Sequence, residues 1–211
     1  MNPNPFIINS KDIKRKTNDY YPTPPIATEA LIFHYKDIIP KRIWEPCCGR
    51  GWMSKVLIEH GYDVYSSDLY TYDNCVIPNI EFNKDFLLSD FEESIEGIIT
   101  NPPYSKNFPE NLIIKSLKSV KFVAVLQRLS FLESARRYEL FKTTRPDVLV
   151  FSNRINFASE NNYNNRKAQY PTGGMMAFAW FIWHPTCNGQ LNWINPKFEF
   201  DNTSTIEGFF S

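Results

Sequence analysis

Lys41-Arg-Ile-Trp-Glu-Pro-Cys-Cys-Gly-Arg-Gly51 decides the fold, because it joins a short apolar strand to an amphipathic helix through a turn with two glycines. Glycines two residues apart allow a sharp turn and a close approach of the backbone to a ligand. The helix that follows, 52–60, would offer free N–H groups at its start to a carboxylate or a phosphate. Gly61 stands at its C-cap position. The stretch predicts one strand–turn–helix unit of an α/β sheet.

Strand-like and helical segments alternate on both sides of this turn. This alternation predicts parallel βαβ units in a doubly wound sheet, with helices on both faces. A loop separates the last two strands, which predicts a terminal antiparallel hairpin in a mostly parallel, seven-stranded sheet. Helices are expected at 26–36, 52–60, 109–119 and 132–142, and strands at 41–47, 63–69, 80–87, 97–100, 122–126, 147–151 and 175–183.

Three segments are expected along the chain. Residues 1–25 are rich in Pro, Asn and Lys and predict an extended N-terminal arm, because the prolines prevent a helix from starting before Pro25. Residues 26–190 form the predicted domain, and 191–211 form a C-terminal tail. Inside the domain, the Asn-rich segment 153–174 predicts a loop with little regular structure.

Acidic residues follow the next two predicted strands. Asp68 comes about 20 residues after the glycine turn, where a carboxylate can accept both hydroxyls of a ribose. Asp85 can accept an adenine amino proton, and Phe86 can pack on the purine face. The carboxyl ends of neighbouring strands meet at one edge of an open α/β sheet. This ordered set predicts a nucleoside-type cofactor there.

Asn101-Pro-Pro-Tyr104 follows the fourth predicted strand directly. Two consecutive prolines make the loop rigid and remove backbone donors. The Asn101 side-chain oxygen and the Pro102 carbonyl could each accept one N–H of a planar NH₂ group, which leaves the nitrogen lone pair aimed at an electrophile. This is positioning and preorganised electrostatics without a general base. Tyr104 can stack on the substrate ring.

Together these motifs resemble the S-adenosylmethionine-dependent N6-adenine DNA methyltransferases, in their order and spacing. Tyr21-Pro-Thr-Pro-Pro25 resembles the N-terminal cofactor motif of that family, and 126–132 and 177–183 are similar to compact phage and prophage members. The resemblance covers about residues 18–184. It implies a class I Rossmann-like methyltransferase fold and S-adenosyl-L-methionine as cofactor. The resemblance does not extend to that family's separate target-recognition domain, so we expect 153–174 and 105–137 to read a sequence.

The resemblance also implies roles residue by residue. Catalysis falls to the loop Asn101, Pro102, Pro103 and Tyr104. The residues implied to bind the cofactor come from the arm, the glycine turn and the strand ends: Tyr21, Thr23, Pro24, Glu45, Pro46, Cys47, Gly49, Gly51, Asp68, Leu69, Asp85, Phe86 and Asn101. Basic residues after Asn101 would grip nucleic acid: Arg128, Arg136, Arg137, Arg154, Arg166 and Lys167.

The predicted activity is methyl transfer to the N6 amine of adenine in DNA, with the base flipped out of the duplex. Three alternatives remain: the same chemistry on RNA adenine, on a protein glutamine amide, or a non-catalytic relative that binds nucleic acid. The motif itself serves all planar NH₂ groups. A phage or restriction-modification role in a bacterial or phage-infected cytoplasm follows from the resemblance. The recognition sequence and the oligomeric state stay open.

Composition supports an ordinary globular protein with 43% hydrophobic and 22% charged residues, which excludes disordered, collagen-like and coiled-coil chains. The net charge is zero, but residues 105–167 hold 12 basic and 5 acidic residues. That basic span suits a nucleic-acid partner. The four cysteines include an adjacent pair, Cys47 and Cys48, which suits neither a disulfide nor a CxxC metal site. We therefore expect no metal, and no membrane partner because apolar runs are short.

Overall fold

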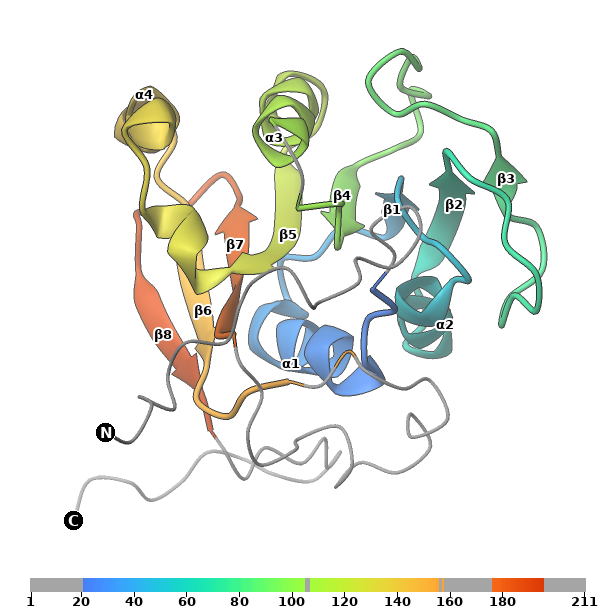
Figure 1. The fold of residues 1–211 in the computed structure, drawn as a ribbon, viewed down its shortest axis with the longest axis horizontal. Coiled ribbons are helices and arrows are strands. Elements are labelled where there is room, and N and C mark those ends of the chain that lie inside the picture. The colour runs from blue at the N-terminus through green and yellow to red at the C-terminus, as the bar shows by residue number, and fades with distance from the viewer. Residues whose placement is uncertain (1–20, 105–106, 156, 158–175, 196–211) are drawn as a thin grey trace, which may run out of the picture.

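A single mixed sheet in the order β3-β2-β1-β4-β5-β7-β6-β8 organises the part of the chain that the structure describes. The structure is a computed structural model, and it describes residues 21–104, 107–155, 157 and 176–195. The strands are β1 (Arg42–Glu45), β2 (Asp63–Asp68), β3 (Glu81–Phe82), β4 (Gly97–Thr100), β5 (Phe122–Arg128), β6 (Asp147–Phe151), β7 (Phe178–Trp183) and β8 (Leu191–Ile194). The sheet runs across Figure 1 from β8 at one edge to β3 at the other.

The pairing directions confirm the predicted α/β sheet and its terminal hairpin. Strands β3, β2, β1, β4 and β5 are mutually parallel. Strand β7 runs antiparallel to both β5 and β6, with Arg128 opposite Phe178. The end of β5 and the start of β7 therefore lie at the same edge of the sheet as the carboxyl ends of β1, β2 and β4.

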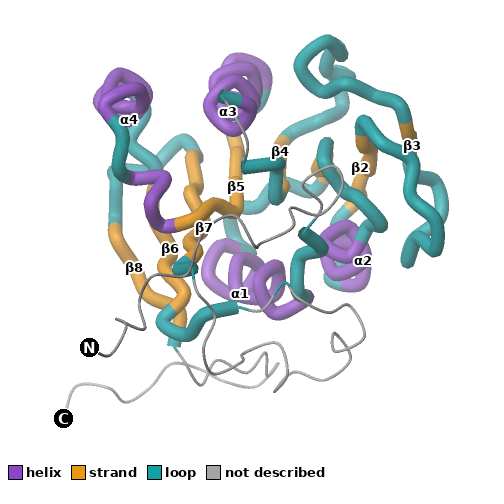
Figure 2. Tube along the Cα trace, viewed as in Figure 1, coloured by secondary structure: helices purple, strands orange, loops and turns teal. Residues whose placement is uncertain are grey.

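Helices cover both faces of the sheet, as predicted (Figure 2). The helices α1 (Pro25–Tyr35) and α2 (Trp52–Glu59) share one core cluster with residues of β5, β6 and β7. The helices α3 (Phe108–Ser119) and α4 (Tyr138–Thr143) pack on the opposite face, with a second cluster. Pro25 at the first position of α1 suits a helix start, because its missing N–H would have no partner there.

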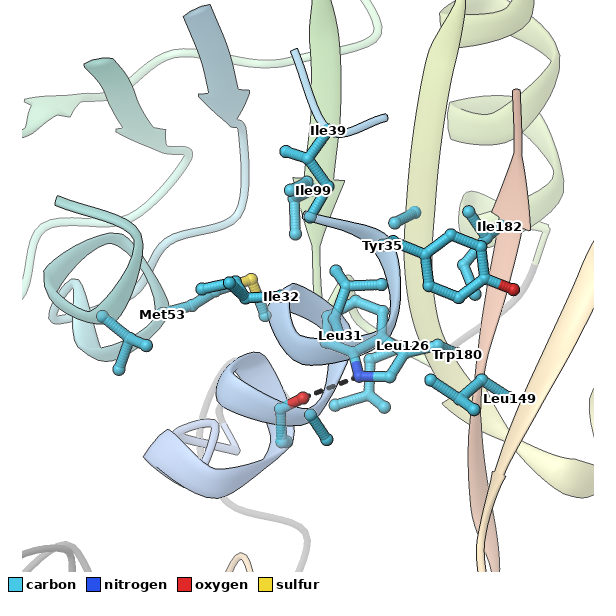
Figure 3. Close-up of a cluster of buried hydrophobic side chains, with 14 of the residues drawn as sticks. Leu31, Ile32, Tyr35, Ile39, Met53, Ile99, Leu126, Leu149, Trp180 and Ile182 are labelled. Atoms are coloured by element: carbon cyan, nitrogen blue, oxygen red, sulfur yellow. Dashed lines mark hydrogen bonds between the residues drawn. The ribbon is translucent and has the colours of Figure 1, made fainter. Parts of the chain in front are cut away.

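Trp180 fixes α1 against the sheet. Its ring is fully buried, and its indole nitrogen donates a hydrogen bond to the Ala27 carbonyl at 2.8 Å (Figure 3). The bond uses a backbone acceptor near the start of α1, directly after the segment 21–24. The first turn of α1 is therefore held in place beside the carboxyl edge of the sheet.

An eighth strand lies in the segment that was predicted to be a tail. Strand β8 pairs in parallel with β6 at the sheet edge, so the described sheet has eight strands and not seven. Its sequence, Leu-Asn-Trp-Ile, gave no strand signal because three of the four residues are exposed. It forms because β6 leaves an unpaired edge that a short extended segment can complete.

Two predicted elements are shorter or broken in the structure. The strand expected at 80–87 has only two residues, because Asn83 takes a positive φ of 60° and turns the chain. The helix expected at 132–142 is two 3₁₀ turns, Leu129–Leu132 and Ala135–Arg137, followed by α4. Ser134 interrupts it, since its hydroxyl accepts a hydrogen bond from the Arg136 backbone N–H and competes with the helical bond.

Candidate functional site

The glycine turn connects β1 to α2 and is tied to the end of β2. Gly49 and Gly51 have φ of 55° and 86°, which favour glycine. A Cβ on Gly51 would lie 2.5 Å from Cγ1 of Ile77, so a larger residue would displace that side chain. The Gly49 N–H donates to Oδ2 of Asp68 at 2.8 Å. The turn and the β2 carboxylate are therefore joined by a direct hydrogen bond.

Asp68 is 6% exposed, and it also accepts a hydrogen bond from the Tyr70 N–H at 2.9 Å. Burial raises the pKa of Asp68 above its usual range, although the backbone N–H groups of Tyr70 and Gly49 counteract this. Leu69 and Tyr70 follow it and are 44% and 42% exposed. Leu69 was a predicted cofactor residue.

Glu45, at the end of β1, is 2% exposed and turns toward α2, where the Ser54 hydroxyl donates to it. Burial raises the pKa of Glu45 to about 8, partly offset by the Ser54 hydrogen bond. Next to it, burial and then the charges of Asp68, Glu45 and Asp85 raise the pKa of the Cys47 thiol. The carboxyl groups of Glu45, Asp68 and Asp85 therefore all lie close enough to Cys47 to act on its thiol.

The loop after β3 is held by a lysine of α3. The Lys115 ammonium donates to the carbonyls of Phe86 at 2.8 Å and Leu87 at 3.0 Å, and also to that of Ser89. Asp85 accepts the Leu87 N–H at 2.8 Å. Phe86 is 2% exposed and packs on Trp44, with ring centroids 5.0 Å apart. Its ring therefore lies in the core. The sequence had suggested instead that this ring is an open face on which a purine could pack.

Asn101 leaves β4 with every polar atom of its carboxamide engaged. Its Nδ2 donates to the Thr23 hydroxyl at 3.0 Å and to the Tyr21 carbonyl at 3.3 Å. Its Oδ1 accepts from the Tyr104 hydroxyl. Pro102, the next residue, is buried. The structure thus brings the end of the predicted arm, residues 21–24, onto the Asn-Pro-Pro-Tyr loop.

The Tyr104 ring lies among three other side chains. Its centroid is 6.2 Å from that of Tyr21 in a stacked arrangement and 5.8 Å from that of Phe178. The Arg128 guanidinium carbon is 5.0 Å from the same centroid, a cation–π contact. Nε of Arg128 is buried, and no hydrogen-bond partner for it is found among the described residues. Arg128 therefore lies beside the Tyr104 ring, and its contact with nucleic acid stays a prediction.

The other predicted nucleic-acid residues divide into three groups. Arg137 is 11% exposed and donates to Glu110 and to the carbonyls of Phe131 and Glu133, so it serves the protein's own structure and the prediction of a phosphate contact there is wrong. Arg136 is 53% exposed and also pairs with Glu110. Arg154 is exposed after β6. Arg166 and Lys167 lie outside the described residues, with most of 153–174.

Glu110 shows how the protein compensates a buried acid by pairing. Burial acts to raise the pKa of Glu110, but hydrogen bonds from Arg137 and Arg136 outweigh it, and the net pKa is lowered.

Within the described ranges, no group of three or more His, Cys, Asp or Glu could hold a metal ion. No helix in those ranges is long and apolar enough to cross a membrane.

No protein-family model matches the chain, and no curated protein matches it. Solved structures do share its fold. A type I restriction-modification methyltransferase subunit from Streptococcus thermophilus is 14% identical over 83% of this chain and 47% of its own, with a TM-score of 0.53. A putative class I S-adenosylmethionine-dependent methyltransferase from Listeria monocytogenes is 11% identical, over 87% of this chain and 69% of its own, with a TM-score of 0.52.

A putative RNA methyltransferase from Pyrococcus horikoshii is 14% identical over 79% of this chain and 86% of its own, with a TM-score of 0.53. At these identities the likeness concerns the fold, which is the Rossmann-like class I methyltransferase fold. The chain spans about half the length of the type I subunit that it resembles.

Proposed function

We propose that this chain is an S-adenosylmethionine-dependent methyltransferase that modifies the exocyclic N6 amine of adenine in DNA. One observation carries the proposal. The Asn101 carboxamide is held in a single orientation at the end of β4, at the same edge as the glycine turn and Asp68. An oriented amide acceptor beside a nucleoside-type site is what methyl transfer to a planar NH₂ group needs.

The residues at the edge fit such a cofactor. Glu45, Asp68 and Asp85 place carboxyl groups around Cys47, and Asp68 is compensated by backbone N–H groups alone among the described residues. Carboxyl groups at this edge suit a ligand with donating hydroxyl and amino groups, because their oxygens can accept those hydrogen bonds. When bound, that cofactor supplies an electrophilic methyl carbon. Asp68 would hold the ribose, Asp85 the adenine, and the glycine turn the methionine part.

The substrate amine would be activated by this chain's own acceptors. Asn101 Oδ1 and the Pro102 carbonyl would each accept one N–H, which favours a pyramidal nitrogen with its lone pair directed at the methyl carbon. The new N–C bond forms as the methyl–sulfur bond breaks, its electron pair stays on sulfur, and the nitrogen then loses a proton to water. The Tyr104 hydroxyl, which occupies Oδ1 here, must move aside for the amine.

Two features favour DNA as the substrate. Residues 105–167 carry a net excess of positive charge, and Arg128 lies beside Tyr104 with its Nε buried. One of the fold neighbours is also the methyltransferase subunit of a type I restriction-modification system. A flipped-out adenine would then stack on Tyr104. The role in a phage or a restriction-modification system belongs to the same proposal.

Transfer of a tritiated methyl group from S-adenosylmethionine tests the proposal directly. Duplex DNA, structured RNA and a glutamine-containing protein are offered in parallel, and the modified nucleoside is identified after digestion. We expect label on N6-methyladenine from DNA, and none with Asn101→Ala. If only the RNA or only the protein is labelled, the substrate is RNA adenine or a protein glutamine amide instead of DNA. Cofactor binding without transfer to any of the three points to the non-catalytic reading.

A further inference from the structure

The orientation of the Asn101 carboxamide is set by a segment that lies 78 residues earlier in the chain. Thr23 Oγ1 and the Tyr21 carbonyl accept the Nδ2 hydrogens at 3.0 and 3.3 Å. A carbonyl can only accept, so the atom facing Tyr21 must be the nitrogen. This chemistry assigns Oδ1 to the opposite side, toward Tyr104.

We infer that Thr23 is a positioning residue for Asn101, a role that rests on the proposed function and differs from the cofactor contact implied for Thr23 by resemblance. Thr23 is 6% exposed, and its hydroxyl is directed at the carboxamide. The carbonyl and the hydroxyl together engage both Nδ2 hydrogens. Only an acceptor, Oδ1, then remains to meet a substrate.

This arrangement makes the site selective for a donor. A carboxamide turned by 180° would place Oδ1 against the Tyr21 carbonyl, which is also an acceptor, and would present N–H groups to the substrate. The Tyr21 carbonyl disfavours that orientation, because it cannot donate to Oδ1, and the Thr23 hydroxyl, which can donate or accept, holds the carboxamide in the orientation that Tyr21 selects. A base with an NH₂ group is therefore matched, and a base with a carbonyl at the same position is opposed.

The start of α1 keeps Thr23 in place. Pro24 precedes the helix with φ of −60° and ψ of 136°, and its carbonyl accepts the Ala27 N–H at 2.9 Å. The Ala27 carbonyl in turn accepts from Trp180 of β7. The Thr23 hydroxyl is thus carried by a rigid helix start that is anchored to the sheet, which is the support a positioning residue needs.

Thr23→Val removes the hydroxyl and keeps the shape, and Thr23→Ser restores the hydroxyl. A matched control is Thr28→Val, because Thr28 is fully buried in α1, the helix that follows Thr23, and its hydroxyl has no hydrogen-bond partner among the described residues. We expect Thr23→Val to lower kcat at saturating cofactor and DNA by roughly 10- to 100-fold, with the dissociation constant of S-adenosylhomocysteine changed less than about twofold. Thr23→Ser and Thr28→Val should stay near wild type.

Two results would overturn the inference. One is an unchanged kcat in Thr23→Val. The other is weaker S-adenosylhomocysteine binding with an unchanged kcat at saturation, which would make Thr23 a cofactor contact.

A second readout does not depend on turnover. The side-chain amide protons of Asn101, assigned by ¹⁵N-asparagine labelling and by their absence from Asn101→Ala, should exchange slowly in wild type and faster in Thr23→Val. Fast exchange in wild type overturns the inference. The amide protons could also exchange slowly in an enzyme that methylates no substrate. That result would confirm the hydrogen bonds of Asn101 but would overturn the proposed function and, with it, the positioning role of Thr23.

Discussion

Buried carboxylates have different partners at the two ends of the strands, the amino edge and the carboxyl edge of the sheet. At the amino edge, Asp147 accepts from Nε2 of His184 at 2.9 Å and from the N–H groups of Gly189 and Gln190 at 3.2 and 2.8 Å. At the carboxyl edge, Glu45 and Asp68 are as deeply buried, but no cation pairs with either among the described residues, and burial raises both pKa values.

The difference separates a structural pair from the site that we propose for the cofactor. Asp147 is saturated by the chain itself and ties the turn after β7 to β6, so nothing is left for a ligand. The carboxyl edge holds the buried acids Glu45 and Asp68, whose pKa values burial raises and which have no cationic partner among the described residues, beside the hydrogen-bonded carboxamide of Asn101. Uncompensated acids cost stability, and they are retained where a ligand supplies the missing positive charge.

The largest effect is expected from the carboxamide. Asn101→Ala removes the acceptor for the substrate amine and should lower turnover by roughly 100- to 1000-fold, about 3–4 kcal/mol in transition-state stabilisation. Calorimetry with S-adenosylhomocysteine should show binding within a few fold of wild type. If Asn101→Ala keeps full turnover, Asn101 is not a catalytic residue. The carboxyl edge would then not differ in function from the amino edge by this measurement.

The uncompensated acid predicts a pH dependence of stability. The pKa of Glu45 is raised to about 8 from 4.5, so the native state holds a proton that the unfolded state has released between those values. Stability from this group is complete below about pH 4.5 and falls as the pH rises toward 8, by about 2–4 kcal/mol. Urea unfolding should show this decline in wild type and a flatter profile in Glu45→Gln. Parallel profiles for the two proteins would mean that Glu45 is ionised in the fold.

A matched pair of alanine variants compares the edges directly. Asp68→Ala should weaken cofactor binding by about 2 kcal/mol, since a charged acceptor for two ribose hydroxyls is lost. Asp147→Ala should leave that affinity unchanged and instead lower the free energy of unfolding by about 1–3 kcal/mol, because His184 and two backbone N–H groups lose their acceptor. Calorimetry and urea unfolding of both variants measure this. Equal cofactor affinities in the two variants would contradict the ribose assignment.

The smallest effect concerns the Tyr104 hydroxyl. Tyr104→Phe removes the group that occupies Asn101 Oδ1 but keeps the ring, so turnover should change by less than about fivefold, or under 1 kcal/mol. Tyr104→Ala should be far more damaging because the stacking face is lost. Steady-state rates compare the two variants. If they lose activity equally, the hydroxyl and not the ring does the work.

Local patterns were sufficient to predict much of the framework. The glycine turn, the alternation of strands and helices and the antiparallel end follow from residues that are near one another in the sequence, because turn chemistry and apolar periodicity are local. The carboxyl-edge positions of Asp68 and Asn101 follow from the same pattern. The short strand β8 had no such signal, since its pairing is determined by the free edge of β6.

What only the tertiary structure decided is which partner each polar or aromatic group meets. The sequence placed Phe86 at the edge, but packing with Trp44 buries it. The sequence suggested that Arg137 contacts a phosphate, but in the structure Arg137 pairs with Glu110, which lies 27 residues away in the chain. Thr23 and Asn101 meet across 78 residues because α1 packs on the sheet beside β4. Residue identity determines what a side chain can bind, whereas long-range packing determines which of those partners is within reach.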